Sequence, residues 1–120
     1  MTTIARFEIP YYSFLKKESE IKRTSLNRDD FITLYSIMQL TRIFDDKAIS
    51  LQRTGKMGTF ASNRGQEAIG AAIGHAMQAD DVLAPYYRDY AAQLQRGVSM
   101  LEIYNYWGGT EWGNHYANNA

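Results

Sequence analysis

The stretch "QEAIGAAIGHAMQ", Gln66 to Gln78, restricts the possible folds more than any other part of the chain. Alanine or glycine occupies positions 68, 70, 71, 72, 74 and 76, so the backbone of a neighbouring element can approach closely. Glycine costs a helix up to about 1 kcal/mol per position relative to alanine, so Gly70 and Gly74 indicate that close packing outweighs helix propensity. We therefore expect an internal helix in a crowded core, and neighbours beyond those that 120 residues supply.

A long helix is expected before this one. From Asn27 to Leu51 apolar residues recur at spacings of three and four, which is the period of a half-buried helix. Asp29 and Asp30 lie where the helix dipole favours negative charge, and Gly55 is a natural stop. A loop or two short strands should follow in "KMGTFASNRG".

Two shorter helices are expected after it. One should run from about Tyr87 to Gly97, and the next should begin at Ser99 with the capping box "SMLE" and end at Gly108 and Gly109. A short extended run is expected at 82–85, because a proline disfavours helical angles in the residue before it. At least half of the segment should thus be helical, with one or two short extended pieces.

Composition excludes several classes of site. Thirteen basic and thirteen acidic residues leave no net charge, so no global field attracts nucleic acid or an anionic membrane. Cysteine is absent, and the two histidines lie forty positions apart, which argues against a metal cluster. No stretch approaches the roughly 20 apolar residues of a membrane span, and no signal peptide is evident. We expect a cytoplasmic protein.

The segment "PYYRD", residues 85–89, has the parts of an anion site. The start of a helix presents free N–H groups, an arginine can hold two oxygens of a phosphate, and phenols can donate hydrogen bonds or stack. Alone the pattern is a weak signal. A tyrosine-arginine pair at the start of a helix far more often reflects core packing together with a surface ion pair, here between Arg88 and Asp89.

The order of the surrounding motifs resembles a known family. "GQEA" at 65–68, "PYYRD" at 85–89 and "RG" at 96–97 resemble the alpha subunit of the thiamin diphosphate-dependent, decarboxylating component of 2-oxo acid dehydrogenase complexes. The resemblance covers the N-terminal portion of that subunit and runs from about Phe31 to Asn114 here. It implies the α/β thiamin diphosphate-binding fold for the parent subunit. We expect a terminal arm at 1–26, the helical portion at 27–114, and a truncated loop at 115–120.

The resemblance implies cofactor-binding residues. Tyr87 and Arg88 match positions that reach the diphosphate of thiamin diphosphate, and Tyr86 lines the same pocket. Thr59 stands where relatives often carry an aromatic residue near the substrate, and the following Phe60 is the alternative contact. With Tyr87, these two residues form the expected substrate vicinity.

The motifs also limit the expected chemistry. Gln66 and Glu67 resemble positions behind the cofactor pocket, although capping of a helix explains them equally well. No catalytic residue is assigned, and His75 and His115 are interpreted as a packing residue and a loop residue. The family holds Mg²⁺ through a Gly-Asp-Gly segment and a later asparagine, so these ligands are expected beyond Ala120.

By resemblance, the parent enzyme decarboxylates a 2-oxo acid and transfers the acyl group to a lipoyl carrier, the step that joins glycolysis to the citrate cycle. Its partners are a beta subunit, in an alpha2-beta2 heterotetramer, and the lipoyl-bearing acyltransferase component. Pyruvate is preferred because "GTF" and "YWGG" resemble pyruvate-type relatives. The alternatives are a branched-chain 2-oxo acid as substrate, or a catalytically inert helical assembly segment. Binding of single-stranded nucleic acid is disfavoured by the charge balance.

Overall fold

The computed structural model describes residues 5–11 and 24–117. About half of these residues lie in four helices, and the described ranges contain no β-strand. The helices are α1 (Arg28–Arg53), α2 (Glu67–Ala76), α3 (Tyr90–Gln95) and α4 (Met100–Gly108). The 82–85 stretch is irregular chain. Most of the predicted terminal arm lies outside the described ranges, and residues 5–11 are exposed.

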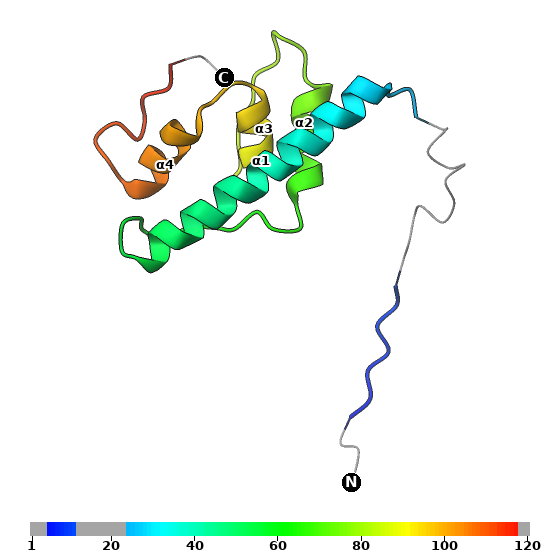
Figure 1. Cartoon of the computed structure of the whole chain (residues 1–120), viewed down its shortest axis with the longest axis horizontal. Helices are drawn as coiled ribbons and strands as arrows, with labels where there is room; N and C mark the ends of the chain where they lie inside the picture. Colours follow the sequence, from blue (N-terminus) through cyan, green and yellow to red (C-terminus); the bar gives the residue numbers. More distant parts are fainter. Residues whose placement is uncertain (1–4, 12–23, 118–120) are drawn as a thin grey trace.

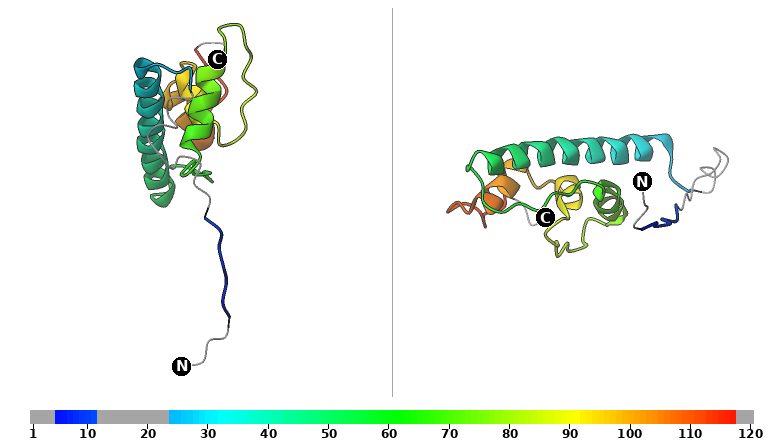
Figure 2. Two further views of the ribbon diagram at one scale, coloured as in Figure 1. Left: turned by 90° about the vertical axis from the view of Figure 1, so that its right-hand side faces the viewer. Right: turned by 90° about the horizontal axis from the view of Figure 1, so that it is seen from below.

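The four helices form two layers. Figure 1 shows the long helix α1 running diagonally across α2 and α3, with α4 beside its C-terminal half, and the two turned views in Figure 2 place α1 on one side of the other three. α1 packs against both α2 and α3, and these two pack against each other. None of the helices in the described ranges has the length and apolar character of a membrane span.

Both ends of α1 follow from local sequence signals. The side chain of Asn27 accepts hydrogen bonds from the N–H groups of Asp29 (2.7 Å) and Asp30 (3.0 Å), and the Asp30 carboxylate accepts one from the Asn27 N–H (2.8 Å). This is a capping box. Just past the other end, Gly55 has φ of +70°, a conformation that favours glycine. The predicted helix is confirmed.

α4 also has the predicted boundaries. The hydroxyl of Ser99 accepts a hydrogen bond from the Glu102 N–H (3.3 Å), and the Glu102 carboxylate accepts one from the Ser99 N–H (2.7 Å). Gly109 caps the other end with φ of +64°. Capping thus fixes where this helix starts and stops.

The core is an aromatic cluster. Phe44 of α1 stacks on Tyr104 of α4, with ring centroids 4.5 Å apart, and lies 5.3 Å from the ring of Tyr90 of α3. Phe60, from the loop between α1 and α2, stacks on Tyr90 at 5.4 Å. One cluster therefore joins three helices and a loop. Its buried members are Phe44, Ala48, Met57, Phe60, Tyr90, Val98 and Ile103.

The glycines of α2 face α3. A Cβ atom built on Gly70 would lie 2.9 Å from the Cβ of Ala91, and one on Gly74 would lie 3.2 Å from the Cα of Ala92. The predicted close approach is therefore present, and this chain supplies the neighbour on that face. On α2, Ile69 and Ile73 remain exposed.

Candidate functional site

A tight turn carries the predicted cofactor-binding residues. The Asp89 N–H donates to the carbonyl of Tyr86 (3.0 Å), and the Asp89 carboxylate accepts a hydrogen bond from the Tyr86 N–H (2.7 Å). This turn delays α3, which begins at Tyr90 and not at the predicted Tyr87. The two central residues, Tyr87 and Arg88, consequently lie in a turn.

The three predicted side chains lie together. The rings of Tyr86 and Tyr87 have centroids 3.9 Å apart, and the guanidinium carbon of Arg88 lies 5.2 Å from the centroid of the Tyr87 ring. Tyr86 is 63% exposed and Tyr87 is 43% exposed. A hydrogen bond with Tyr87 raises the pKa of the Tyr86 phenol above its ordinary value.

The guanidinium of Arg88 makes no ion pair within the described part of the chain. The Asp89 carboxylate, with which an ion pair was considered, instead accepts the Tyr86 N–H. The Nε atom of Arg88 is buried and has no hydrogen-bond partner among the described residues. A buried donor without a partner is energetically costly. Arg88 thus has unused capacity for an anionic ligand.

A pocket of about 200 Å³ lies beside this turn. Its wall is mostly aromatic and includes both tyrosines of the turn. Phenol hydroxyls at the rim can donate hydrogen bonds, while the rings offer apolar faces. Tyr86 and Tyr87 therefore line a pocket and are not buried in the core. The lining residues are Pro85, Tyr86, Tyr87, Tyr90, Gln93, Ile103, Tyr106, Trp107 and Tyr116.

Arg96, from the predicted "RG" motif, holds the loop that leads to the turn. Its guanidinium donates to the main-chain carbonyls of Gln78 (3.0 Å) and Asp81 (2.7 Å). These two bonds join the start of the 78–96 segment to its end, and the turn and α3 lie between them. The motif thus has a structural role next to the candidate site.

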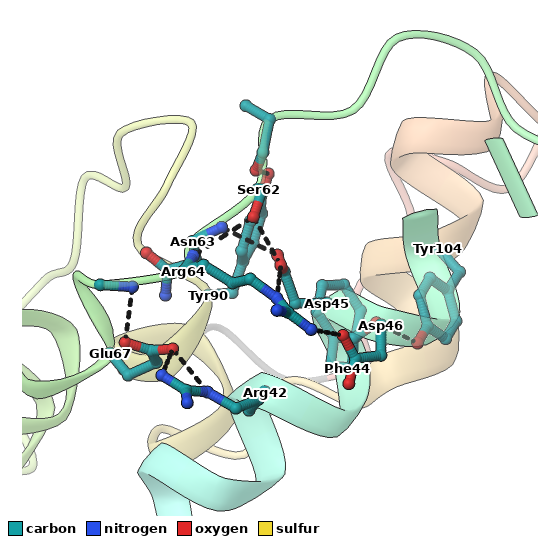
Figure 3. Close-up of polar contacts among 12 residues, drawn as sticks. Arg42, Phe44, Asp45, Asp46, Ser62, Asn63, Arg64, Glu67, Tyr90 and Tyr104 are labelled. Carbon is teal, nitrogen blue, oxygen red and sulfur yellow. Dashed lines mark hydrogen bonds and ion pairs between the residues drawn. The ribbon is translucent and has the colours of Figure 1, made fainter. Parts of the chain in front are cut away.

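A second polar cluster joins α1 to the loop before α2, and Figure 3 shows its members. Asp45 accepts hydrogen bonds from the Ser62 hydroxyl (2.6 Å) and the Asn63 N–H (2.8 Å). Arg64 forms an ion pair with the neighbouring Asp46. Sequence reasoning missed Asp45. The available signal was an acidic residue directly after the core residue Phe44 and one turn after Thr41, which is also buried.

Glu67 has a defined partner on α1. Its carboxylate accepts from Nε of Arg42 at 2.9 Å, pairs with Nη2 of the same guanidinium at 2.5 Å, and accepts the Gly65 N–H at 2.9 Å. Burial acts to raise the pKa of Glu67, but the hydrogen bonds from Arg42 and the main chain outweigh it, so the pKa is lowered. Gln66 precedes the helix and makes no side-chain cap.

Glu67→Gln is expected to remove an acid-sensitive part of the stability. A carboxyl group with a lowered pKa stabilises the fold above its unfolded value, and this contribution is lost as the pH falls through the folded pKa. Because Arg42 is half exposed, we expect the variant to lose about 1 kcal/mol at pH 7. The difference from wild type should shrink below about pH 4.5, the ordinary value.

The measurement is the free energy of unfolding by urea between pH 7 and pH 3. Glu111→Gln, which changes an exposed glutamate, is the matched control and should run parallel to wild type. A gap between Glu67→Gln and wild type that stays constant with pH would contradict the assigned role of the ion pair.

The other predicted residues are dispersed. Thr59 is exposed, whereas Phe60 lies in the aromatic core, so the suggested substrate vicinity of these two stays a prediction. His75 on α2 lies 3.5 Å from the Asp30 carboxylate of α1, and the ring of His115 lies 5.6 Å from that of Trp112. Within residues 5–11 and 24–117, no three His, Cys, Asp or Glu side chains gather as metal ligands would.

Comparison with known proteins gives a consistent set of relatives. A family model described as the dehydrogenase E1 component matches residues 35–119. Several curated proteins named pyruvate dehydrogenase E1 component subunit alpha are similar to this chain. No solved structure matches it.

Three of these relatives show the extent of the similarity. The protein of Mycoplasma pneumoniae is 35% identical over 92 residues, covering 77% of this chain and 26% of that protein. The protein of Acholeplasma laidlawii is 34% identical over 99 residues, covering 82% and 29%. That of Bacillus cereus is 32% identical over 102 residues, covering 85% and 28%. The chain therefore spans little more than a quarter of the length of these relatives.

Proposed function

This chain belongs to the dehydrogenase E1 component family, and from that membership we propose that it forms the N-terminal part of a pyruvate dehydrogenase alpha subunit. The names of the relatives and the presence of the "GQEA" and "PYYRD" motifs in this chain support this proposal. The parent enzyme would decarboxylate pyruvate and transfer the acetyl group to a lipoyl carrier. A branched-chain 2-oxo acid is the alternative substrate.

The unpaired guanidinium of Arg88 is the observation that carries the proposal. It lies 5.2 Å from the centroid of the Tyr87 ring, its Nε has no partner in the described ranges, and its neighbours Tyr86 and Tyr87 line the aromatic pocket, whereas Arg88 itself does not. A diphosphate supplies the oxygens that such a donor lacks, through charge-assisted hydrogen bonds. Tyr87 can add a phenolic hydrogen bond, and Tyr86 lies beside it on the pocket wall. These residues therefore fit the diphosphate of thiamin diphosphate.

When bound, thiamin diphosphate supplies the decarboxylation chemistry, and the protein positions it. The residues of this chain would bind and orient the cofactor: Arg88 neutralises charge, while Tyr87 donates a hydrogen bond. We assign proton transfer to none of them. The Mg²⁺ that accompanies the diphosphate would take its ligands from residues that follow Ala120 in the parent subunit.

We propose that the complete site needs further polypeptide. A beta subunit would close the cofactor site in an alpha2-beta2 assembly, and a lipoyl-bearing acyltransferase would accept the product. The half-exposed aromatic rim of the pocket supports an incomplete site of this kind, because aromatic residues are enriched at protein interfaces. A reducing cytoplasmic location agrees with the absence of cysteine.

Arg88→Ala is expected to weaken thiamin diphosphate binding. The affected protein is the complete alpha subunit that carries this chain, assembled with its beta subunit. Loss of hydrogen bonds from a charged donor should raise the dissociation constant about tenfold or more. The measurement is a calorimetric titration with thiamin diphosphate at saturating Mg²⁺. Arg53→Ala, an exposed arginine in the last turn of α1, is the matched control and should leave the constant unchanged.

Unchanged affinity of the Arg88→Ala assembly would remove Arg88 from the cofactor site. The isolated 120-residue chain, titrated in the same way, should show no measurable saturation. Tight binding by the isolated chain would instead contradict the need for a second polypeptide. Inert behaviour of both the chain and the assembly would favour the alternative of a helical assembly segment.

A further inference from the structure

Asp45 is a buried charge that the proposed function does not use. It is 1% exposed and lies on the face of α1 that is directed at the loop before α2. A buried carboxylate is costly unless hydrogen bonds compensate it. Both of its oxygens are engaged, by the Ser62 hydroxyl at 2.6 Å and the Asn63 N–H at 2.8 Å. The Nε atom of Arg64 adds a charge at 3.9 Å.

The loop depends on these bonds because it has few of its own. From Met57 to Asn63, within the described part of the chain, no main-chain N–H donates to a main-chain carbonyl. Side chains outside the loop supply hydrogen bonds to it from two sides. Asp45 holds the loop from α1, and the Tyr90 hydroxyl donates to the carbonyl of Ala61 (3.2 Å) from α3. The loop conformation is therefore set by side chains outside it.

α1 holds both ends of the stretch that connects the loop to α2. Asp45 fixes residues 62 and 63, and Arg42, one turn earlier on the same helix, pairs with Glu67 at the start of α2. Figure 3 shows the two side chains extending from α1 to these two points. Since residues three apart lie on one helix face, a single face of α1 sets the path of this chain segment.

We infer that Asp45 is a positioning residue for the substrate. It binds Ser62 and thereby fixes the loop that carries Thr59, three residues before Ser62. The inference rests on the proposed function and on the family resemblance, by which Thr59 stands at a position near the 2-oxo acid. An apolar side chain at position 45 could fill space equally well, but it could not orient the Ser62 hydroxyl and the Asn63 N–H together. The carboxylate therefore fixes the geometry of the loop and not only its burial.

The test uses the complete assembled enzyme and the variant Asp45→Asn, which keeps the shape and removes the charge. The amide keeps one oxygen that can accept from the Asn63 N–H, but its NH2 group can only donate to the Ser62 oxygen, so the contact with Ser62 reverses direction and both contacts lose the carboxylate charge. We expect kcat/KM for pyruvate to fall about tenfold or more, mainly through a higher KM, because a small displacement of a substrate contact is costly. The dissociation constant of thiamin diphosphate should change less than twofold, on the order of the error of a binding measurement.

Two further variants make the test specific. Asp46→Asn changes the adjacent exposed carboxylate, which pairs with Arg64, and should leave KM unchanged. Ser62→Ala removes one of the two bonds to Asp45 and adds no volume, so it should raise KM by a smaller factor even if Asp45→Asn fails to assemble. Hydrogen exchange of the 58–66 peptide should be faster in both Asp45→Asn and Ser62→Ala than in wild type.

The outcomes separate the two proposals. A wild-type assembly that does not decarboxylate pyruvate would refute the proposed function, whatever the exchange data show. An active wild type whose Asp45→Asn and Ser62→Ala variants keep their KM would overturn the positioning role. A parallel rise of KM and of the cofactor dissociation constant would also overturn it, because a general loss of structure predicts that result.

Discussion

Replacing Phe44 by alanine is expected to lower the free energy of unfolding by about 3–5 kcal/mol, the usual cost of truncating a buried phenylalanine. Phe44 is fully buried and contacts rings from three other segments. It stacks on Tyr104, lies 5.3 Å from Tyr90, and meets Phe60 edge to face at 6.0 Å. Truncation therefore removes the centre of the core and leaves a cavity. The measurement is urea unfolding followed by circular dichroism.

The matched control is Tyr35→Ala on the same helix. Tyr35 is 62% exposed, so its removal should change stability by about 0.5 kcal/mol or less. Small domains have total stabilities of about 5–15 kcal/mol, so loss of cooperative unfolding in Phe44→Ala also agrees with the prediction. Equal stability of the two variants would show that the aromatic cluster does not hold the helices together.

The same aromatic cluster raises the pKa values of two tyrosine phenols. Burial raises the pKa of Tyr104 to about 12, and the charge of Asp45 acts in the same direction. The pKa of Tyr90 is raised for the same two reasons. Both hydroxyls donate to main-chain carbonyls, Tyr104 to Phe44 (2.9 Å) and Tyr90 to Ala61 (3.2 Å). Protonated phenols are thus required at these two contacts, and the raised pKa values keep them protonated.

Helix boundaries were predictable where the signals are local. Asn27 with Asp30, and Ser99 with Glu102, form their capping boxes within four residues, so the sequence contains the complete arrangement. The start of α3 was predicted three residues too early. There, the Asp89 carboxylate closes a turn before the helix begins, and the apolar pattern does not distinguish that turn from a first helical turn.

The polar loop contacts were not predictable because they are nonlocal. Asp45 and Ser62 are 17 positions apart, and Arg42 and Glu67 are 25 apart. No spacing rule connects such residues until the path of the chain is known. Glu67 was noted through the family resemblance, but its pairing with Arg42 required the structure. Helix propensity and capping thus determine the elements, while buried charges determine how the loops join them.

The family was predicted from motifs and is confirmed by the family match to residues 35–119. The site residues remain a prediction, although the structure adds to their support. Sequence alone left an ion pair between Arg88 and Asp89 open, and the structure assigns the Asp89 carboxylate to the turn instead. The described residues thus contain no ion pair between Arg88 and Asp89, and this observation supports the proposed role for Arg88 in holding an anion.

Gly70→Ala is expected to destabilise the fold by about 1–3 kcal/mol, the usual cost of overpacking. The new Cβ atom would lie 2.9 Å from the Cβ of Ala91 and 3.3 Å from the main-chain N of Ala92, closer than carbon atoms approach without repulsion. Both alanines are fully buried, so neither can move into solvent. The helix propensity of alanine opposes this effect by at most about 1 kcal/mol.

Gly108→Ala separates packing from propensity. Position 108 is also helical, and its added Cβ would meet only the Cγ2 of Thr110 at 3.5 Å, an ordinary contact. Urea unfolding of this variant should show unchanged or slightly higher stability, while Gly70→Ala unfolds at lower urea. If both variants match wild type, α2 and α3 can move apart without cost, and close packing does not explain the glycines of α2. A loss confined to Gly70→Ala would mean that the contact between α2 and α3 requires glycine, because propensity alone favours alanine at both positions.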